Sequence, residues 1–419
     1  MPRPGGHLLD LESGDATSTL PARMKPVALQ RCDRFVGRTM NWMYDHLRAL
    51  PRYRPLVIAD QLENREEFPE LDAWRWNRES LPRRVWRKAL GPRLFPPDLH
   101  RLRRRNPALL HSHFGYVATG DHALRRSLEI PWVVGFYGAD VYELPSSPGW
   151  RSRLDRIFDE AARVLPLGPR MGERLRELGC PPEKVVVHNL GVDVDALAYV
   201  RRARREDEPL RLLFAGTFRE KKGIPDLIEA LHLLHSDGVP IHLDLVGEAA
   251  SKPGDAQVRD HVLERIERWG LEDIVTRHPF LPFDDLVALG RRCHVLVTPS
   301  VTAASGDSEG TVFIIQQMMA TGMPVVATRH ADIPHTFGPM ADRLVGERDP
   351  AALAGAIRRY VDEPDALTED GLLFRSHAET SLDIRVAAEA LADIYDEVLG
   401  RATGSERISD TGSEARLQS

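Results

Sequence analysis

Two loops in the second half of the chain combine charged or amide side chains with expected helix starts. In FAGTFREKKGIPDLIEALHLL (residues 214–234), an apolar run ends at Gly216, a basic loop with Lys221 and Lys222 follows, and helical spacing begins near Ile224. The first N–H groups of a helix lack intrahelical partners and the helix dipole favours negative charge, so this loop can hold a phosphate. A solvated basic loop with a glycine turn accounts for the same residues.

The second loop lies in SEGTVFIIQQMMATGMPVVATRHADIP (residues 308–334), where Glu309, Gly310 and Thr311 precede an apolar helical stretch. Gln317 follows Glu309 by eight residues, slightly more than two helical turns. Gln317 therefore lies on nearly the same side of the helix as the entrance. A carboxylate at that entrance can accept hydrogen bonds from sugar hydroxyls, and a side-chain amide can bind a diol. The alternative is that Glu309 caps the helix and Gln317 lies on the surface.

Short β-branched runs alternate with amphipathic stretches, which indicates parallel sheets covered by helices on both faces. The expected strands lie at residues 55–60, 108–114, 132–137, 163–167 and 184–189, then at 211–217, 241–247, 294–300 and 324–328. A charged stretch, YVRRARREDEPL, separates the two sets. We therefore expect an α/β protein with two Rossmann-like domains facing across a cleft, at residues 26–195 and 210–385, with a linker at 196–209. Ligands of such sheets bind at the carboxyl ends of the strands, where both loops lie.

The length and composition agree with this organisation. A chain of 419 residues exceeds what one hydrophobic core usually organises, and no apolar run reaches the roughly 18 residues that span a bilayer. The first 25 residues lack the apolar core of a secretory signal and the three cysteines are scattered, which favours a cytoplasmic location. Residues 1–25 and 401–419 are polar and aperiodic, so we expect both to be disordered. The net charge of −6 gives no global reason to bind nucleic acid.

Two further groups of residues have the types found in metal sites. Asp193 and Asp195 form an Asp-any-Asp pair, which can hold a divalent ion on a diphosphate, but they follow the last expected strand of the first domain and favour a turn. His111 and His113 point to the same face of an expected strand, with no clear third ligand nearby. We therefore predict no metal site.

Four motifs occur in the order LLHSHFGYVATGDHALRRSLEIPWVVGFYGADVY, KVVVHNLGVDVDAL, GTFREKKGIPDLIEAL and GDSEGTVFIIQQMMATGMPVVATRHADIP. Together they resemble the family 4 glycosyltransferases, retaining enzymes with the two-Rossmann GT-B architecture, and among them the branch that builds bacterial exopolysaccharides such as colanic acid. The resemblance extends over residues 26–400. It implies a last helix, at residues 386–400, that crosses back to pack on the first domain.

The resemblance implies a nucleotide-sugar site in the second domain. Lys222 would neutralise the diphosphate of the donor, and Glu309 would contact the hydroxyls of the donor sugar as the second catalytic residue. Phe280 lies in the loop whose backbone meets the nucleotide base in the family. The residues expected to bind the donor are Gly216, Thr217, Arg219, Phe280, Gly310, Thr311, Val312 and Gln317.

The chain departs from the family pattern at three positions. Gln317 stands where a glutamate usually holds the ribose hydroxyls, and a hydrogen bond to a neutral group is weaker than one to a charged group. Thr217 stands where an arginine often partners the lysine, and Arg219 is the candidate substitute. Tyr137 replaces a histidine at the end of a strand of the first domain. On the acceptor side the expected residues are His113, Tyr137 and Asp140.

The implied activity is transfer of a sugar, with retention, from a nucleoside-diphosphate sugar such as a UDP or GDP sugar to a lipid-linked or polysaccharide acceptor. A preorganised cation and helix-terminal amides stabilise the charge that develops on the leaving diphosphate, so neither a metal nor another cofactor is expected. The three departures leave a second possibility, a catalytically weak, sugar-nucleotide-binding partner subunit of a glycan-assembly complex.

Residues 74–105 are strongly basic, with eleven Arg or Lys against two acidic residues and with interleaved aromatic residues. Cationic side chains beside aromatic anchors suit the anionic inner face of a membrane, where a lipid-linked acceptor would lie. Nucleic-acid binding is the rival use of such a patch, but the chain contains no recognisable nucleic-acid module. A solvated helical surface remains the third interpretation.

Overall fold

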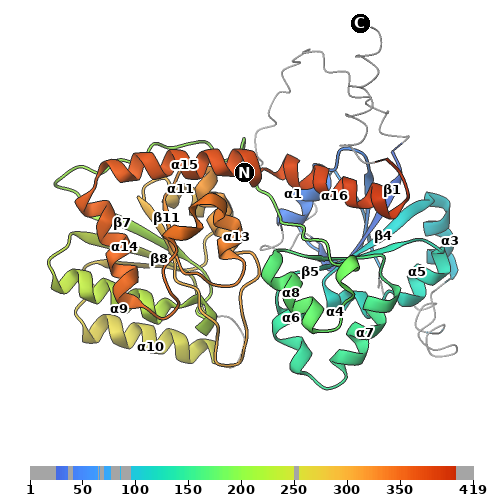
Figure 1. The fold of residues 1–419 in the computed structure, drawn as a ribbon, viewed down its shortest axis with the longest axis horizontal. Helices are drawn as coiled ribbons and strands as arrows, with labels where there is room; N and C mark the ends of the chain where they lie inside the picture. Colours follow the sequence, from blue (N-terminus) through green and yellow to red (C-terminus); the bar gives the residue numbers. More distant parts are fainter. Residues whose placement is uncertain are drawn as a thin grey trace, which may run out of the picture.

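The computed structural model of the protein describes residues 25–35, 41–64, 66, 70–76, 85, 96–249 and 254–402. Within these residues the strands form two parallel sheets, one from each half of the chain (Figure 1). The strand order is β3-β2-β1-β4-β5-β6 in the first sheet and β11-β10-β7-β8-β9 in the second. The termini that the sequence predicts to be disordered lie almost wholly outside the described residues.

The strands of the first sheet are β1 (Val27–Phe35), β2 (Arg54–Leu62), β3 (Asp72–Arg75), β4 (Pro107–His113), β5 (Trp132–Phe136) and β6 (Arg163–Pro166). Those of the second sheet are β7 (Leu210–Ala215), β8 (Ile241–Val246), β9 (Val275–His278), β10 (Val295–Thr298) and β11 (Val325–Ala327). The central strands β5 and β10 are buried at every position, which is why they appear in the sequence as continuous apolar runs.

The helices of the first half are α1 (Asn41–Arg48), α3 (Pro96–Arg105), α4 (Gly115–Ala118), α5 (His122–Leu128), α6 (Ala139–Tyr142), α7 (Trp150–Glu160) and α8 (Pro169–Glu177). Those of the second half are α9 (Ile224–Ser236), α10 (Asp255–Arg268), α11 (Phe283–Gly290), α12 (Phe313–Ala320), α13 (Ile333–Phe337), α14 (Pro350–Asp362), α15 (Asp365–Ser381) and α16 (Ile384–Val398). Among the described residues, no helix has both the length and the apolar character needed to cross a membrane.

The predicted fold class is confirmed, although individual strands differ from the expectation. The strand predicted at residues 184–189 is wrong, because this segment contributes only an isolated bridge between Val185 and Val164. The sequence pattern missed β1, β3 and β9. In β1 the apolar run is interrupted by Gln30, whose side-chain oxygen lies against the His113 ring, and by Arg31, whose guanidinium donates to Asp60.

The C-terminal helix α16 crosses back onto the first half of the chain, as predicted. Figure 1 shows α15 beside the second sheet and α16 continuing beside α1. The outgoing and returning segments meet where Val192 pairs with Asp383, and a Cβ on Gly191 would lie 2.7 Å from the Asp383 carbonyl oxygen. Tyr395 of α16 is fully buried in a core shared with α1 and β1. The helix therefore ties the two halves together.

Candidate active site

The loop after β7 is held against the end of β10 by a glycine. Lys221 and Lys222 lie in a short 3-10 turn, η3 (Glu220–Lys222), and Gly223 follows with φ of +62°. A Cβ on Gly223 would lie 1.8 Å from the carbonyl oxygen of Pro299, so both the backbone conformation and the space require glycine. This contact brings the basic loop to the carboxyl end of β10, from which the loop at residues 299–312 departs.

The structure brings Lys222 and Glu309 together. The Lys222 Nζ lies 2.8 Å from the Glu309 Oε1, at the entrance of α12. The glutamate is buried, whereas a fifth of the Lys222 side chain is exposed. Burial raises the pKa of Glu309, but the positive charges of Lys222 and Lys221 lower it by more, so the net shift is downward and the carboxylate is ionised.

The two adjacent lysines have different surroundings. The Lys221 Nζ donates to the carbonyl oxygen of Ser308 at 2.9 Å and lies 3.2 Å from the Asp307 Oδ1. Only 10% of the Lys221 side chain is exposed, against 20% for Lys222. Lys221 therefore fixes the loop that carries Glu309, and Lys222 is the lysine that a ligand can reach.

Arg219 and Thr217 precede the two lysines in the loop after β7. The Arg219 guanidinium is 2.7 Å from the Asp307 Oδ2, and it also approaches Glu143 of the first half at 3.9 Å. Thr217 is exposed and carries no cationic group to replace the arginine of the family pattern. Gly216 lies beneath the Lys222 stem, because a Cβ there would be 3.4 Å from the Lys222 Cδ.

The entrance of α12 also contacts the first half of the chain. A Cβ on Gly310 would lie 2.6 Å from the carbonyl oxygen of Tyr137, so glycine permits this close approach. The Thr311 hydroxyl donates to the Asn189 Oδ1 at 3.3 Å. Val312 is the N-cap position of α12, and no side chain of the described residues caps it. The helix entrance therefore lies between the two sheets with backbone amides left for a ligand.

Gln317 is half-buried, and its neighbour Gln316 makes the contact that bridges the halves. The Gln316 Nε2 donates to the Asn189 Oδ1 at 3.2 Å, and the side chain is fully buried. The sequence pattern did not indicate Gln316 or Asn189, because the spacing of eight residues singles out Gln317 and carries no information about which segment of the first half packs against α12.

Of the predicted acceptor-side residues, His113 and Asp140 are buried inside the first half and Tyr137 is partly exposed. The Tyr137 hydroxyl donates to the His113 Nδ1 at 2.6 Å, and the His113 Nε2 lies 2.9 Å from the Gln30 Oε1. Burial, followed by the nearby His46 and His188, lowers the pKa of His113 to about 3, so the ring is neutral. Both ring nitrogens are occupied, which leaves none for a substrate.

Asp140 stabilises a turn. Its carboxylate accepts hydrogen bonds from the backbone N–H groups of Gly115 at 2.8 Å, Gly138 at 3.0 Å and Tyr137 at 3.1 Å. Burial raises the pKa of Asp140, and these backbone donors offset part of the increase. The residue therefore shapes the loop after β5 that touches Gly310.

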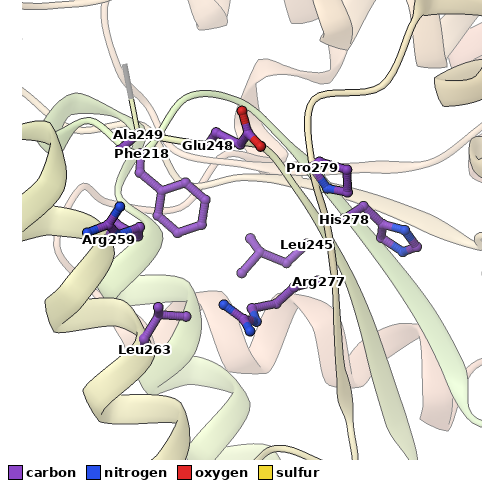
Figure 2. Close-up of a pocket in the computed structure, with 10 residues that line it drawn as sticks. Phe218, Leu245, Glu248, Ala249, Arg259, Leu263, Arg277, His278 and Pro279 are labelled. Carbon is purple, nitrogen blue, oxygen red and sulfur yellow. The ribbon is translucent and has the colours of Figure 1, made fainter. Parts of the chain in front are cut away.

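Phe280 lies after β9 and is 48% exposed. Next to it in the chain, His278 and Pro279 line a pocket of about 470 Å³ between α10 and the ends of β8 and β9. Figure 2 shows Phe218 and Arg259 of α10 on the side of this pocket opposite His278 and Pro279. The pocket adjoins the loop expected to meet the nucleotide base.

The aspartate pair and the histidine pair that have the residue types of metal sites make other contacts in the structure. The Asp193 Oδ1 accepts the N–H groups of Asp195 and Ala196, both at 3.1 Å, which is the geometry of a turn. His111 and His113 share a face of β4 with ring centroids 4.2 Å apart, and the His111 Nδ1 lies 2.7 Å from the Tyr395 hydroxyl. Over the residues that the structure describes, no three His, Cys, Asp or Glu side chains form a metal-binding group.

Two family descriptions match the chain and together cover most of it. Residues 36–191 match "Glycosyl transferase 4-like domain" and residues 209–363 match "Glycosyl transferases group 1". The WcaL protein of Escherichia coli (strain K12), described as a putative colanic acid biosynthesis glycosyltransferase, is 32% identical over 254 residues, 59% of this chain and 60% of that protein. The amylovoran biosynthesis glycosyltransferase AmsK of Erwinia amylovora is 28% identical over 68% of this chain and 69% of its own length. The matched regions thus span about 60 to 69% of these relatives.

Solved structures share the architecture at low sequence identity. A glycosyltransferase from Rickettsia africae superposes with a TM-score of 0.73 at 16% identity, over 90% of this chain and all of that chain. Anabaena HepE, solved in complex with UDP, gives a TM-score of 0.70 at 15% identity over 89% of this chain and all of that chain. These likenesses establish the GT-B fold. The two family descriptions, matched over residues 36–191 and 209–363 and together over more than half of the chain, show that the chain belongs to the family 4 glycosyltransferases.

Proposed function

We propose that the protein transfers a glycosyl group from a nucleoside-diphosphate sugar to a lipid-linked or polysaccharide acceptor, with retention and without a metal ion. The observation that carries the proposal is the Lys222 Nζ, 2.8 Å from Glu309 at the entrance of α12. The proposal is supported by relatives named for colanic acid and amylovoran biosynthesis and by HepE, which was solved with UDP and with UDP-glucose.

Donor binding would redistribute an existing ion pair. In the free protein Lys222 neutralises the buried Glu309 carboxylate. A diphosphate beside Lys222 and the free amides at residues 310–312 would share the lysine, and the Glu309 carboxylate could then accept hydrogen bonds from the sugar hydroxyls. Because the site is partly desolvated, these interactions are stronger than they would be in water.

The chemical step needs no covalent help from the protein. The bond between the anomeric carbon and the diphosphate oxygen breaks, and its electron pair leaves with the nucleoside diphosphate. The acceptor oxygen bonds to the anomeric carbon on the same face, and its proton passes to the departing phosphate oxygen. Lys222 and the helix-terminal amides stabilise the negative charge that grows on the leaving group.

A donor and product analysis tests this proposal. Purified protein is incubated with a panel of UDP and GDP sugars together with lipid-linked and polysaccharide acceptors, and release of nucleoside diphosphate is measured with and without EDTA. We expect turnover of at least one donor, unaffected by EDTA, and proton NMR of the product should show the anomeric configuration of the donor. Inversion, or loss of turnover in EDTA that added metal restores, would contradict the corresponding part of the proposal.

We further propose that α3 meets the anionic inner face of the membrane, where a lipid-linked acceptor would be presented. Arg101, Arg103 and Arg104 of α3 are exposed. Trp74 packs against the hydrophobic core of the first half, and the Arg101 guanidinium carbon lies 3.5 Å from the centroid of its ring. The Trp74 ring is therefore not a free membrane anchor. Most of residues 77–95 of the basic segment lies outside the described residues.

Vesicle sedimentation tests this contact. We expect binding to phosphatidylglycerol vesicles at low salt and none to phosphatidylcholine vesicles, since each basic residue near an anionic surface contributes about 1 kcal/mol. The double change Arg103→Glu and Arg104→Glu should weaken binding. The matched control, Arg259→Glu and Arg268→Glu on the exposed side of α10, should not. Equal sedimentation of the two variants would remove the membrane contact.

A further inference from the structure

Behind Glu309 lies a buried histidine that the sequence motifs did not single out. His330 follows β11, and its side chain is wholly inaccessible to solvent. Its Nε2 is 3.1 Å from the backbone nitrogen of Glu309 and 3.0 Å from the Ser308 Oγ, and its Nδ1 is 2.6 Å from the Glu347 Oε1. One ring therefore joins the catalytic loop to a carboxylate on another loop.

These contacts determine which ring nitrogen carries the proton. A backbone N–H can only donate, so the Nε2 that faces Glu309 must present its lone pair. The proton of the neutral ring is then on Nδ1, where the Glu347 carboxylate accepts it. The same carboxylate accepts the backbone N–H of Thr302 at 2.8 Å. Burial raises the pKa of Glu347, but Thr302 and His330 lower it by more, which keeps the acceptor ionised.

Ser308, His330 and Glu347 are arranged like the nucleophile, base and carboxylate of a catalytic triad. Their geometry nevertheless argues against nucleophilic catalysis by Ser308. The Nε2 that would take a serine proton already faces the Glu309 N–H. Ser308 is buried, so a substrate carbonyl has no access to its hydroxyl. The arrangement instead fixes the position of the backbone at residues 308 and 309.

We propose that His330, oriented by Glu347, is a positioning residue that holds the Glu309 backbone so that the Glu309 carboxylate faces Lys222 and the donor sugar. This inference rests on the proposed glycosyl transfer at the same site. Lys221 supports the loop from the opposite side through the Ser308 carbonyl oxygen, so the two contacts together define the position of Glu309.

The proposed role requires a neutral imidazole. If Nε2 carried a proton, its N–H group would face the backbone N–H group of Glu309, and the Glu309 amide would lose its acceptor. The charged groups around the ring are Glu347 on one side and Glu309 on the other, with Lys222, Lys221 and Asp307 next to Glu309.

Two nearly isosteric variants separate positioning from packing. His330→Gln can place its amide oxygen where Nε2 accepts the Glu309 N–H, whereas His330→Met fills similar space without an acceptor. We expect His330→Met to lower kcat for donor turnover by at least about tenfold, because a buried donor is left unsatisfied, with a smaller change in KM. His330→Gln should recover most of kcat, and equal kcat values for the two variants would overturn the proposal.

A spectroscopic measurement gives an answer that does not depend on turnover. The protein is labelled with nitrogen-labelled histidine, and the His330 ring signals are assigned by their loss in His330→Gln. We expect the tautomer with the proton on Nδ1 at neutral pH, and the other tautomer would overturn the proposal. If wild-type protein binds and turns over no nucleotide sugar, the proposed function fails, and the tautomer still decides whether this histidine accepts the Glu309 amide.

Discussion

At the scale of single residues, two adjacent lysines differ in what they contact. Lys221 is enclosed by Asp307 and the Ser308 carbonyl oxygen, whereas Lys222 faces Glu309 from the solvent side. The sequence could predict that Lys222 and Glu309 meet, because both follow strands that end at the same edge of a parallel sheet. It could not predict that His113 and Asp140 are fully used by neighbours, nor that His330 contacts Glu309. Such partners depend on packing between segments far apart in the chain.

Replacing the two lysines should have different effects. Lys222→Ala is expected to lower kcat by about 100-fold, since it removes the cation that stabilises the leaving diphosphate, and to lower the melting temperature, since the buried Glu309 carboxylate loses its partner. Lys221→Ala should lower the melting temperature without removing that cation, because Asp307 and the Ser308 carbonyl lose a buried partner. Initial rates and thermal unfolding of both variants provide the test. A Lys222→Ala protein with wild-type kcat would exclude its catalytic role.

At the scale of elements, one carboxylate of the second half binds the N-terminus of a helix in the first half. The Asp332 carboxylate accepts the N–H groups of Arg170 at 2.7 Å and Met171 at 3.1 Å, at the start of α8. A Cβ on Gly168 would lie 2.3 Å from the Asp332 Cγ, so glycine allows this approach. The motif pattern of the sequence gives no sign of this contact, because its two sides are more than 160 residues apart.

Asp332→Ala should weaken the contact that holds the two halves of the chain against each other. We expect a loss of about 0.5–2 kcal/mol in stability, the usual cost of removing a helix cap, and a larger radius of gyration in X-ray scattering from solution. Asp349→Ala is the matched control, because Asp349 caps α14 within the second half through the Ala352 N–H. The same radius of gyration for both variants would show that Asp332 does not restrain the halves.

At the scale of the whole molecule, the return of α16 covers a cluster of buried histidines in the first half. Burial lowers the pKa of His46 to about 4 and that of His188 to about 3, and burial and neighbouring histidines lower that of His111. The two-domain fold and the crossing helix were predictable from the strand and helix pattern and the family resemblance. The histidine cluster was not, because it forms only when β4, α1 and the segment at residues 184–191 pack together.

The histidine cluster predicts acid sensitivity of the fold. Below the ordinary histidine value of 6.5, the unfolded chain binds protons that the folded chain excludes, so stability falls as the pH drops toward 4. Each such histidine adds about 1.4 kcal/mol per pH unit to the slope of the free energy of unfolding against pH. His188→Asn should reduce the slope measured by urea unfolding between pH 6 and 5, whereas the exposed His100→Asn should not. Identical slopes for the two variants would contradict this assignment.

Calorimetry of nucleotide binding, comparing UDP with UMP and GDP with GMP, tests most directly whether Lys222 holds the diphosphate of the donor. If Lys222 and the entrance of α12 hold the second phosphate, wild-type protein should bind one diphosphate at least about tenfold more tightly than its monophosphate, a difference of about 1.4 kcal/mol. Lys222→Ala should lose most of this preference, because only the amides at the entrance of α12 then remain to hold the second phosphate. A preference for the diphosphate that is undiminished in Lys222→Ala would place the phosphates elsewhere and contradict the role of Lys222.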